Sequence, residues 1–259
     1  MKDTNKVILG HKIIGFGKNK VMAIHSWMDD AESWNTLIPY LNTNEFTYAF
    51  IDVRGYGSSK NISGNYNSDE ITEDIFNLAS ELGWQSFNLI GHSMSGLVAQ
   101  KATLLDTENR IDKVVLITPV SAAGVPVNEQ NLKFFQSIVQ NEEMAKLAYG
   151  LFTSNKLSED WAEKRARRHV EVTNRNAQIG YLFMWTQENF IESMTTIKKP
   201  FLVISGKNDF PRFNLENQKI AFENFNKVDF IDIESAGHFP MQETPVLLAT
   251  EIEKFLSLN

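Results

Sequence analysis

The stretch LIGHSMSGLVAQ, residues 89–100, places a polar residue, Ser93, where a β-strand pattern changes into a helix pattern. Gly91 and Ser95, two residues before and two after the serine, are both small. A sharp strand-turn-helix needs small residues at these points, because the backbones of the strand and the helix nearly touch there. Ser93 is therefore predicted to be held in a strained, exposed conformation at a helix N-terminus. A serine that only caps the N-terminus of a helix would give a similar local pattern. Whether Ser93 has a chemical role must therefore be inferred from the rest of the sequence.

The composition is typical of a soluble globular protein. The chain has 259 residues, of which 42% are hydrophobic and 22% are charged, and its formal charge is -7. These values fit one large domain or one domain with an insertion, and no basic stripe points to nucleic acid as a partner. The absence of cysteine excludes disulfides and thiolate chemistry. No segment reads as a signal peptide or a membrane span, so we expect a cytoplasmic protein without membrane contact.

Short β-rich runs alternate with helix patterns along most of the chain. Such an alternation predicts a mainly parallel sheet that is covered by helices on both faces. The first two runs, on either side of His11, are predicted to pair as an antiparallel hairpin at one edge. The candidate strands are KVIL, KIIGFG, KVMAIH, TYAFIDV, SFNLIGH, KVVLITPV, PFLVISG and KVDFIDIE.

Residues 127–190 break this alternation, since they contain several helix patterns and no convincing strand. A predicted strand ends before them at Val120, and another begins after them at Pro200. We therefore expect residues 1–126 and 191–259 to form an α/β core. Residues 127–190 are predicted to form a helical cap over one edge of the sheet.

A serine hydroxyl becomes a good nucleophile when a base takes its proton and an acid orients that base. His238 is the best candidate for the base, because it follows the strand run KVDFIDIE and precedes the last helix pattern. His169 lies in a charged helix pattern and is expected to be a solvated surface residue. Asp209 follows the run PFLVISG and is the best candidate for the acid, since the region after KVVLITPV has no carboxylate before Glu129. The carboxyl ends of parallel strands, where ligand sites lie, would bring these residues near Ser93.

In their order and over nearly the whole chain, these segments resemble the α/β-hydrolase fold superfamily, in its serine-nucleophile, esterase-like branch with a helical cap. GHSMSG resembles the family's nucleophile elbow, GKNDF its acid loop, AGHFPMQETP its histidine loop and AIHSWMDDAESW its oxyanion loop. IDVRGYGSS resembles a structural turn, so Asp52, Arg54, Gly55 and Gly57 are expected to shape a loop. The resemblance implies a mostly parallel, doubly wound sheet with the all-helical cap inserted between strands 6 and 7.

The resemblance also implies an oxyanion hole formed by the backbone N–H groups of Trp27 and Met94. The sequence departs from the family at two nearby points. Ser26 follows His25 where the family usually has glycine, a residue that tolerates unusual dihedral angles. Ser26 therefore either changes the shape of the oxyanion loop or adds a hydroxyl to the site. Ser95 replaces the usual glycine of the elbow with another small residue.

The implied mechanism is two-step acyl transfer that needs no metal or organic cofactor. Ser93 attacks a carbonyl carbon while His238 takes its proton, and Asp209 orients the imidazole. Water then attacks the acyl-enzyme. A serine at this position argues against haloalkane dehalogenase or epoxide hydrolase chemistry, because enzymes of both kinds resemble this fold but use a carboxylate nucleophile.

The aromatic residues of the helical segment are expected to form mostly its own core, and some of them to line an apolar pocket above Ser93. Its basic residues Lys164, Arg165, Arg167 and Arg168 are expected to form a solvated helix face. The residues predicted to contact the substrate are His25, Ser26, Met28, Val120, Phe135, Trp185 and Phe239.

Three functions are compatible with this sequence. The favoured one is hydrolysis of small or medium apolar carboxylic esters, with lactones as a further substrate group. The alternatives with the same residues are carbon–carbon bond cleavage in a diketone and perhydrolysis. A binding protein that has lost turnover is disfavoured, because the serine, the acid and the histidine are all present.

Overall fold

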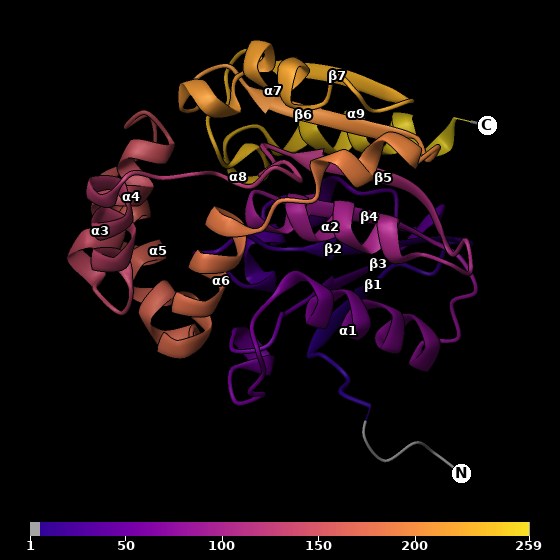
Figure 1. The fold of residues 1–259 in the computed structure, drawn as a ribbon, viewed down its shortest axis with the longest axis horizontal. Coiled ribbons are helices and arrows are strands. Elements are labelled where there is room, and N and C mark those ends of the chain that lie inside the picture. The colour runs from indigo at the N-terminus through magenta and orange to yellow at the C-terminus, as the bar shows by residue number, and fades with distance from the viewer. Residues whose placement is uncertain (1–5, 259) are drawn as a thin grey trace.

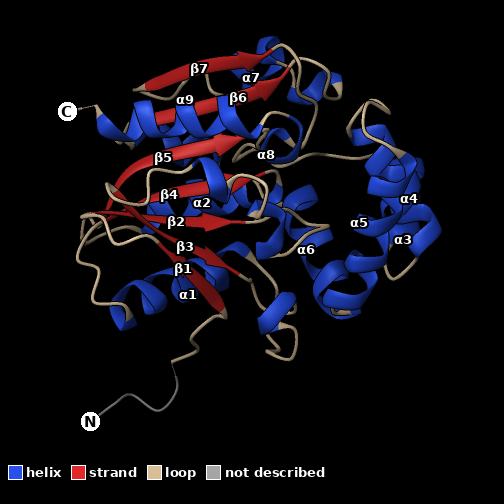
Figure 2. Cartoon of the chain, turned by 180° about the vertical axis from the view of Figure 1, so that it is seen from behind, coloured by secondary structure: helices blue, strands red, loops and turns tan. Residues whose placement is uncertain are grey.

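The protein, analysed as a computed structural model that describes residues 6–258, contains a seven-stranded sheet in the order β1-β3-β2-β4-β5-β6-β7. Each neighbouring pair is parallel except β1 and β3, which are antiparallel. Figure 2 shows the arrows of β4–β7 pointing toward the same side of the molecule. The strands are β1 (His11–Ile14), β2 (Asn19–Ile24), β3 (Phe46–Ile51), β4 (Phe87–His92), β5 (Ile111–Ile117), β6 (Phe201–Gly206) and β7 (Val228–Ile233).

Helices cover both faces of this sheet. Helices α1 and α2 lie on one face and α9 lies on the other, as the opposite views of Figures 1 and 2 show. The α-helices are α1 (Ser68–Glu81), α2 (Met94–Leu105), α3 (Glu129–Ile138), α4 (Glu142–Phe152), α5 (Glu159–Val172), α6 (Arg175–Gln187), α7 (Leu215–Ala221), α8 (Pro240–Glu243) and α9 (Pro245–Ser257). The 3-10 helices are η1 (Ala31–Trp34), η2 (Ile38–Tyr40), η3 (Gly57–Ser59), η4 (Ile191–Thr196) and η5 (Pro211–Phe213).

The central strands are buried on both faces. Every residue of β3, β4 and β6 is buried, which explains why these strands read as continuous apolar runs rather than as alternating ones. The predicted parallel, doubly wound α/β sheet is confirmed.

The N-terminal part of the sheet differs from the prediction. The run KVIL forms no strand, although Leu9 is buried. Instead, the backbone of Gly10 bonds to the loop after β3, since its N–H donates to Ser59 and its carbonyl accepts from Asp52. β1 pairs with β3, with His11 opposite Ile51. The predicted hairpin is therefore wrong, because the pairing partner of β1 is distant in sequence.

Helices α3–α6 form one continuous helical segment, here called the helical insertion, between β5 and β6. These two strands are the runs KVVLITPV and PFLVISG, which the prediction numbered 6 and 7. They are β5 and β6 here because KVIL does not enter the sheet. The arrows of β2 and of β4–β6 point toward the side of the molecule on which α3–α6 lie (Figure 2). The insertion thus lies on the side of the sheet where Ser93 follows β4.

The loop after β3 has the structural role that was expected. The Asp52 carboxylate accepts hydrogen bonds from the backbone N–H groups of Ala31 and Ser58, at 2.7 and 2.8 Å. Arg54 forms a two-point ion pair with the buried Asp74, at 2.6 and 2.8 Å. These bonds connect the loop to η1 and to α1.

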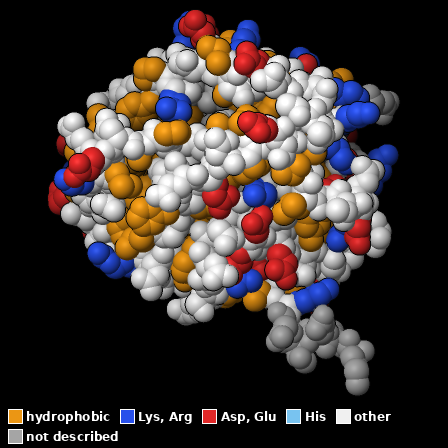
Figure 3. Space-filling view, in the orientation of Figure 1, with side chains coloured by type: hydrophobic (Ala, Val, Ile, Leu, Met, Phe, Trp, Pro, Cys, Tyr) orange, Lys and Arg blue, Asp and Glu red, His pale blue; other side chains and the backbone are white. Residues whose placement is uncertain are grey.

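The surface combines both signs of charge with small apolar areas. On the face shown in Figure 3, acidic and basic side chains are interspersed, and hydrophobic side chains gather on the side where α3 and α4 lie. Leu147 and Leu151 of α4 are exposed apolar residues. Within residues 6–258, no helix has both the length and the apolar character needed to cross a bilayer.

Candidate active site

Ser93 occupies the sharp turn between β4 and α2 in a strained conformation. Its φ of 54° and ψ of -116° lie outside the regions that a non-glycine residue normally adopts. A Cβ at Gly91 would come within 2.2 Å of the Ser95 carbonyl oxygen, and a Cβ at Gly96 within 2.4 Å of Pro119. The Ser93 carbonyl accepts 2.9 Å hydrogen bonds from the N–H groups of Gly96 and Val120. These contacts explain why the turn needs small residues.

The loops after β6 and β7 bring Asp209 and His238 to this serine. His238 Nε2 lies 2.8 Å from Ser93 Oγ, and His238 Nδ1 lies 2.6 Å from Asp209 Oδ2. A carboxylate can only accept a hydrogen bond, so Nδ1 carries the proton and Nε2 is free to accept from the serine hydroxyl. The structure therefore brings together the three residues that the sequence singled out, in an order suited to proton transfer.

The surroundings hold the acid and the imidazole in place. The Asp209 side chain is fully buried, and its Oδ1 accepts a 2.7 Å hydrogen bond from the N–H of Phe210. Burial raises the pKa of Asp209, while the neighbouring His238 and the N–H of Phe210 act in the opposite direction. The rings of Phe152 and Phe213 each lie 4.8 Å from the imidazole of His238, measured between ring centroids.

Two backbone N–H groups beside Ser93 are free to bind a ligand oxygen. Within residues 6–258, neither the N–H of Trp27 nor that of Met94 has a hydrogen-bond acceptor. Both residues line the cavity that contains Ser93. Met94 is also the first residue of α2, where the helix dipole favours negative charge.

The cavity at Ser93 is small and almost entirely apolar. Its volume is about 70 Å³, taken as the space open to the centre of a water molecule. Phe152, at the end of α4, also lines it and is one of the insertion aromatics from which pocket residues were expected. Val125, in the loop after β5, and Phe213, in η5, line it as well, and the sequence analysis missed both. The residues predicted to contact substrate that do line the cavity are Ser26, Met28, Val120, Phe135, Trp185 and Phe239.

His25 is the exception among the predicted contact residues. It is fully buried behind the loop and does not line the cavity. Its Nδ1 donates a 2.8 Å hydrogen bond to the carbonyl of Ser26, and its Nε2 accepts one of 3.2 Å from the N–H of Val53. Its role is thus to support the loop. Ser26 has no left-handed backbone conformation, so this loop does not need glycine there.

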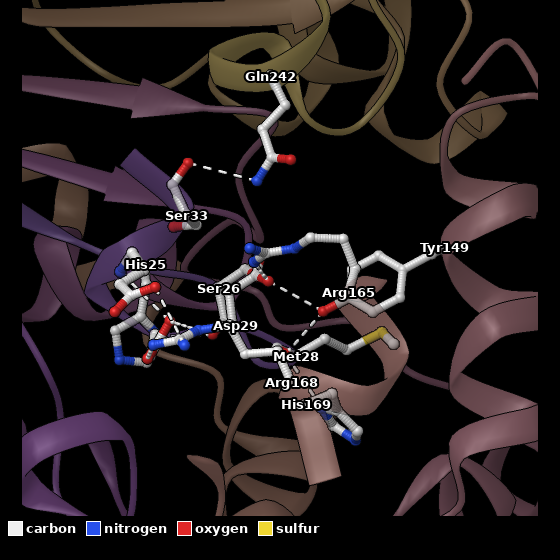
Figure 4. A network of polar contacts seen from close by, with 12 residues as sticks. His25, Ser26, Met28, Asp29, Ser33, Tyr149, Arg165, Arg168, His169 and Gln242 are labelled. Carbon is white, nitrogen blue, oxygen red and sulfur yellow. Dashed lines mark hydrogen bonds and ion pairs between the residues drawn. The ribbon is translucent and has the colours of Figure 1, made fainter. Parts of the chain in front are cut away.

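Two surface predictions for α5 are wrong. His169 is 1% exposed, with its Nδ1 3.0 Å from the carbonyl of Met28. Lys164 and Arg167 are exposed, as expected. Arg165 and Arg168, however, pair with Asp29 and Asp30 on the loop after β2 (Figure 4). The pairs join segments 136 and 138 residues apart, a separation that sequence periodicity cannot detect. Among the described residues, no group of three or more histidine, aspartate or glutamate side chains could hold a metal ion.

Comparison with known families agrees with this geometry. Residues 19–245 match the model of the alpha/beta hydrolase fold family. The chain therefore belongs to the alpha/beta hydrolase fold family.

The curated relatives match part of the chain. A serine hydrolase-like protein of Mus musculus is 31% identical over 109 residues, which are 41% of this chain and 34% of the relative. A serine hydrolase-like protein of Danio rerio is 26% identical over 156 residues, or 60% of this chain and 46% of the relative. The matches thus span between a third and a half of the length of these relatives.

Solved structures share the fold over nearly the whole chain. An esterase from Exiguobacterium antarcticum has a TM-score of 0.86 and 18% sequence identity, with 96% of this chain and 95% of that chain covered. At this identity, the likeness concerns the fold.

Proposed function

We propose that the protein is a serine hydrolase that cleaves small to medium apolar carboxylic esters, including lactones, through an acyl-enzyme. The observation that carries the proposal is the hydrogen-bonded series from Ser93 Oγ through His238 to Asp209, which opens into an apolar cavity. An isolated N-cap serine would not need a buried imidazole and carboxylate behind it.

In the proposed reaction, His238 takes the hydroxyl proton as Ser93 Oγ attacks the ester carbonyl carbon. Asp209 holds the imidazole in the required tautomer and stabilises its protonated form. The protonated His238 then gives its proton to the leaving alcohol. A water molecule enters, loses a proton to His238 and attacks the acyl-enzyme. The protonated His238 then gives its proton to Ser93 Oγ as the acid leaves, which restores both residues.

The proposed oxyanion hole is formed by the N–H groups of Trp27 and Met94. Both are unpaired within the described part of the chain, so they can donate to the oxygen that becomes negative in each tetrahedral intermediate. Loss of one such donor typically lowers the rate by about 10²–10³. The positive end of the α2 dipole acts in the same direction.

The cavity supports a preference for apolar groups of limited size. Its walls are formed almost entirely by Met, Val, Phe and Trp side chains, of which Phe135, Phe152 and Trp185 come from the helical insertion. We therefore propose that this insertion acts as a cap that limits the acyl or alcohol group. Burial of apolar substrate atoms against these side chains supplies the binding free energy.

A substrate panel tests the proposal. Purified wild type and Ser93→Ala would be assayed on chromogenic esters, lactones and diketones, and for perhydrolysis. We expect ester hydrolysis by the wild type and a loss of several orders of magnitude in Ser93→Ala, with an unchanged circular dichroism spectrum. Cleavage of diketones alone, or perhydrolysis alone, would replace the ester proposal with the corresponding activity. Full activity in Ser93→Ala would exclude the serine mechanism.

The matched control is Ser121→Ala. Ser121 lies in the neighbouring groove outside the cavity, and its Oγ lies 3.4 Å from the N–H of Ala123. We expect this variant to retain its ester hydrolysis.

A further inference from the structure

The loop that carries the N–H of Trp27 is attached to the helical insertion. This segment, residues 25–30, joins β2 to η1. The Trp27 indole donates a 2.8 Å hydrogen bond to the carbonyl of Gln178 in α6. The Met28 carbonyl lies 2.8 Å from the Tyr149 hydroxyl of α4 and 3.0 Å from His169 Nδ1 of α5. Three helices of the insertion therefore contact consecutive residues of this loop.

Asp29 is the central residue of these contacts. Its side chain is fully buried, and its Oδ1 pairs with Arg165 and lies 2.9 Å from the Tyr149 hydroxyl. Its Oδ2 accepts a 3.1 Å hydrogen bond from the hydroxyl of Ser26. Figure 4 shows Tyr149 and Arg165 reaching to this loop from the insertion. One carboxylate thus joins α4 and α5 to the residue before Trp27.

The charge states suit a permanent ion pair. Burial raises the pKa of Asp29, but Arg165 and the hydrogen bonds from Arg165 and Tyr149 outweigh it and hold that pKa below its usual value. Burial lowers the pKa of Arg165, whereas the charge of Asp29 raises it, with a net increase. Both pKa shifts therefore favour the charged form of each group.

A buried ion pair of this kind is a weak source of stability, because removing two charges from water costs about as much as their attraction returns. What the pair does supply is a fixed set of partners for one carboxylate, because Asp29 contacts Arg165 and Tyr149 through Oδ1 and Ser26 through Oδ2. The pair is also placed beside a group whose position matters for catalysis, since Ser26 and Trp27 both line the cavity at Ser93.

We propose that Asp29 is a positioning residue that fixes the N–H of Trp27 for the oxyanion by holding Ser26 through its hydroxyl. Arg165 and Tyr149 in turn fix Asp29. This inference rests on the proposed esterase function. It assigns the helical insertion a second role, because its helices set the geometry of the oxyanion loop as well as the walls of the cavity. It also explains the serine at position 26, whose hydroxyl provides a bond that glycine cannot form.

The test compares Ser26→Ala, Asp29→Asn and Tyr149→Phe with the wild type on one ester. Ser26→Ala removes the bond to Asp29 and leaves the ion pair with Arg165 intact. We expect kcat to fall by about 10-fold to 100-fold, which is somewhat less than the fall caused by removing an oxyanion donor. KM should change by less than about threefold. Affinity for n-butylboronic acid, which forms a tetrahedral adduct with serine, should fall in proportion to kcat.

A double-mutant cycle distinguishes a positioning role of Asp29 from a general effect of the substitution on the structure. If Asp29 acts through the hydroxyl of Ser26, Asp29→Asn should lower kcat less in the Ser26→Ala background than in the wild type. Additive effects, or losses in KM alone, would overturn the proposal. Circular dichroism and urea unfolding check the fold of every variant. Should Asp29→Asn fail to fold, Ser26→Ala and Tyr149→Phe keep the ion pair and still decide the question.

The matched control is Arg168→Gln, which breaks the neighbouring pair with Asp30 but does not touch Ser26. We expect its kcat to stay close to that of the wild type. An equal loss of kcat in this control would show that docking of α5 as a whole matters, and would overturn the specific role of Asp29. A wild type that hydrolyses no ester would contradict the proposed function itself, whereas an active wild type with unaffected Ser26→Ala and Asp29→Asn variants would contradict only this inference.

Discussion

His92 Nε2 donates a 2.7 Å hydrogen bond to the backbone carbonyl of His238. The same carbonyl accepts a 3.1 Å hydrogen bond from the hydroxyl of Thr118, at the end of β5. The residue before Ser93 is thereby bonded to the loop that carries the proposed base. The position of the imidazole thus depends on the ends of two neighbouring strands as well as on Asp209.

The burial of His92 keeps its imidazole neutral and predicts acid sensitivity. Burial and the nearby His238 lower the pKa of His92 to about 3, and burial lowers the pKa of His169. Between the folded and unfolded pKa values the unfolded chain binds more protons, so stability decreases as the pH falls below about 6.5. At pH 5, His92 alone would lower the free energy of unfolding by about 2 kcal/mol.

Urea unfolding between pH 5 and pH 7 measures this slope. His169→Gln should have a smaller slope than the wild type, because one buried imidazole is removed while a donor to the Met28 carbonyl is kept. The raised pKa of Asp209 makes stability decrease as the pH rises, which is opposite to the effect of the buried histidines. The test therefore compares the pH slope of His169→Gln with the pH slope of the wild type. Equal slopes would contradict a neutral, buried His169.

Asp209→Asn should greatly reduce ester hydrolysis. The amide can donate to His238 Nδ1 and so favour the tautomer that cannot accept the proton of Ser93, and such a change lowers kcat by about 10⁴ in a triad of this kind. Steady-state kinetics measure the loss. Glu129→Gln is the matched control, because Glu129 is on α3 and its ion pair with Lys133 is exposed. A large loss of activity in Glu129→Gln, together with normal activity in Asp209→Asn, would mean that the acid lies in the helical insertion.

Phe135→Ala should change the preferred length of the acyl chain. Phe135 lines both the cavity at Ser93 and a larger groove, of about 470 Å³ in the same measure, between α3, α4 and η5. Without this ring, longer chains could extend into the groove, and each further buried methylene, worth about 0.8 kcal/mol, would raise kcat/KM about fourfold.

An ester length series measures this effect. Phe134→Ala is its control, because Phe134 lines the groove but not the cavity. Identical length profiles in the wild type and in Phe135→Ala would mean that this ring does not limit the substrate.

Gly91→Ala should destabilise the fold more than Gly83→Ala. At Gly91 the added Cβ would meet the backbone oxygen of Ser95 at 2.2 Å, and neither backbone can move without breaking β4 or α2. We expect a loss of roughly 3 kcal/mol. At Gly83, with a φ of 70°, the added Cβ meets nothing within 4 Å, so only backbone strain of roughly 1–2 kcal/mol remains. Urea denaturation compares the two, and similar losses would contradict the close approach at Gly91.

Much of the fold and of the candidate site could be predicted from sequence, because both depend on local patterns. The continuous apolar runs of buried parallel strands, and the small residues around Ser93, leave direct traces in the order of amino acids. The positions of Asp209 and His238 just after strand runs were sufficient to select them, since the carboxyl ends of parallel strands meet at one edge of the sheet.

Only the tertiary structure decided which distant segments meet. The pairing of β1 with β3, the burial of His169 and the ion pair between Asp29 and Arg165 each join parts of the chain that no local periodicity relates. A charged residue on an amphipathic helix has the same sequence pattern whether it faces water or a buried partner. Burial depends on what packs against that helix, and for α5 that neighbour is the loop beside Ser93.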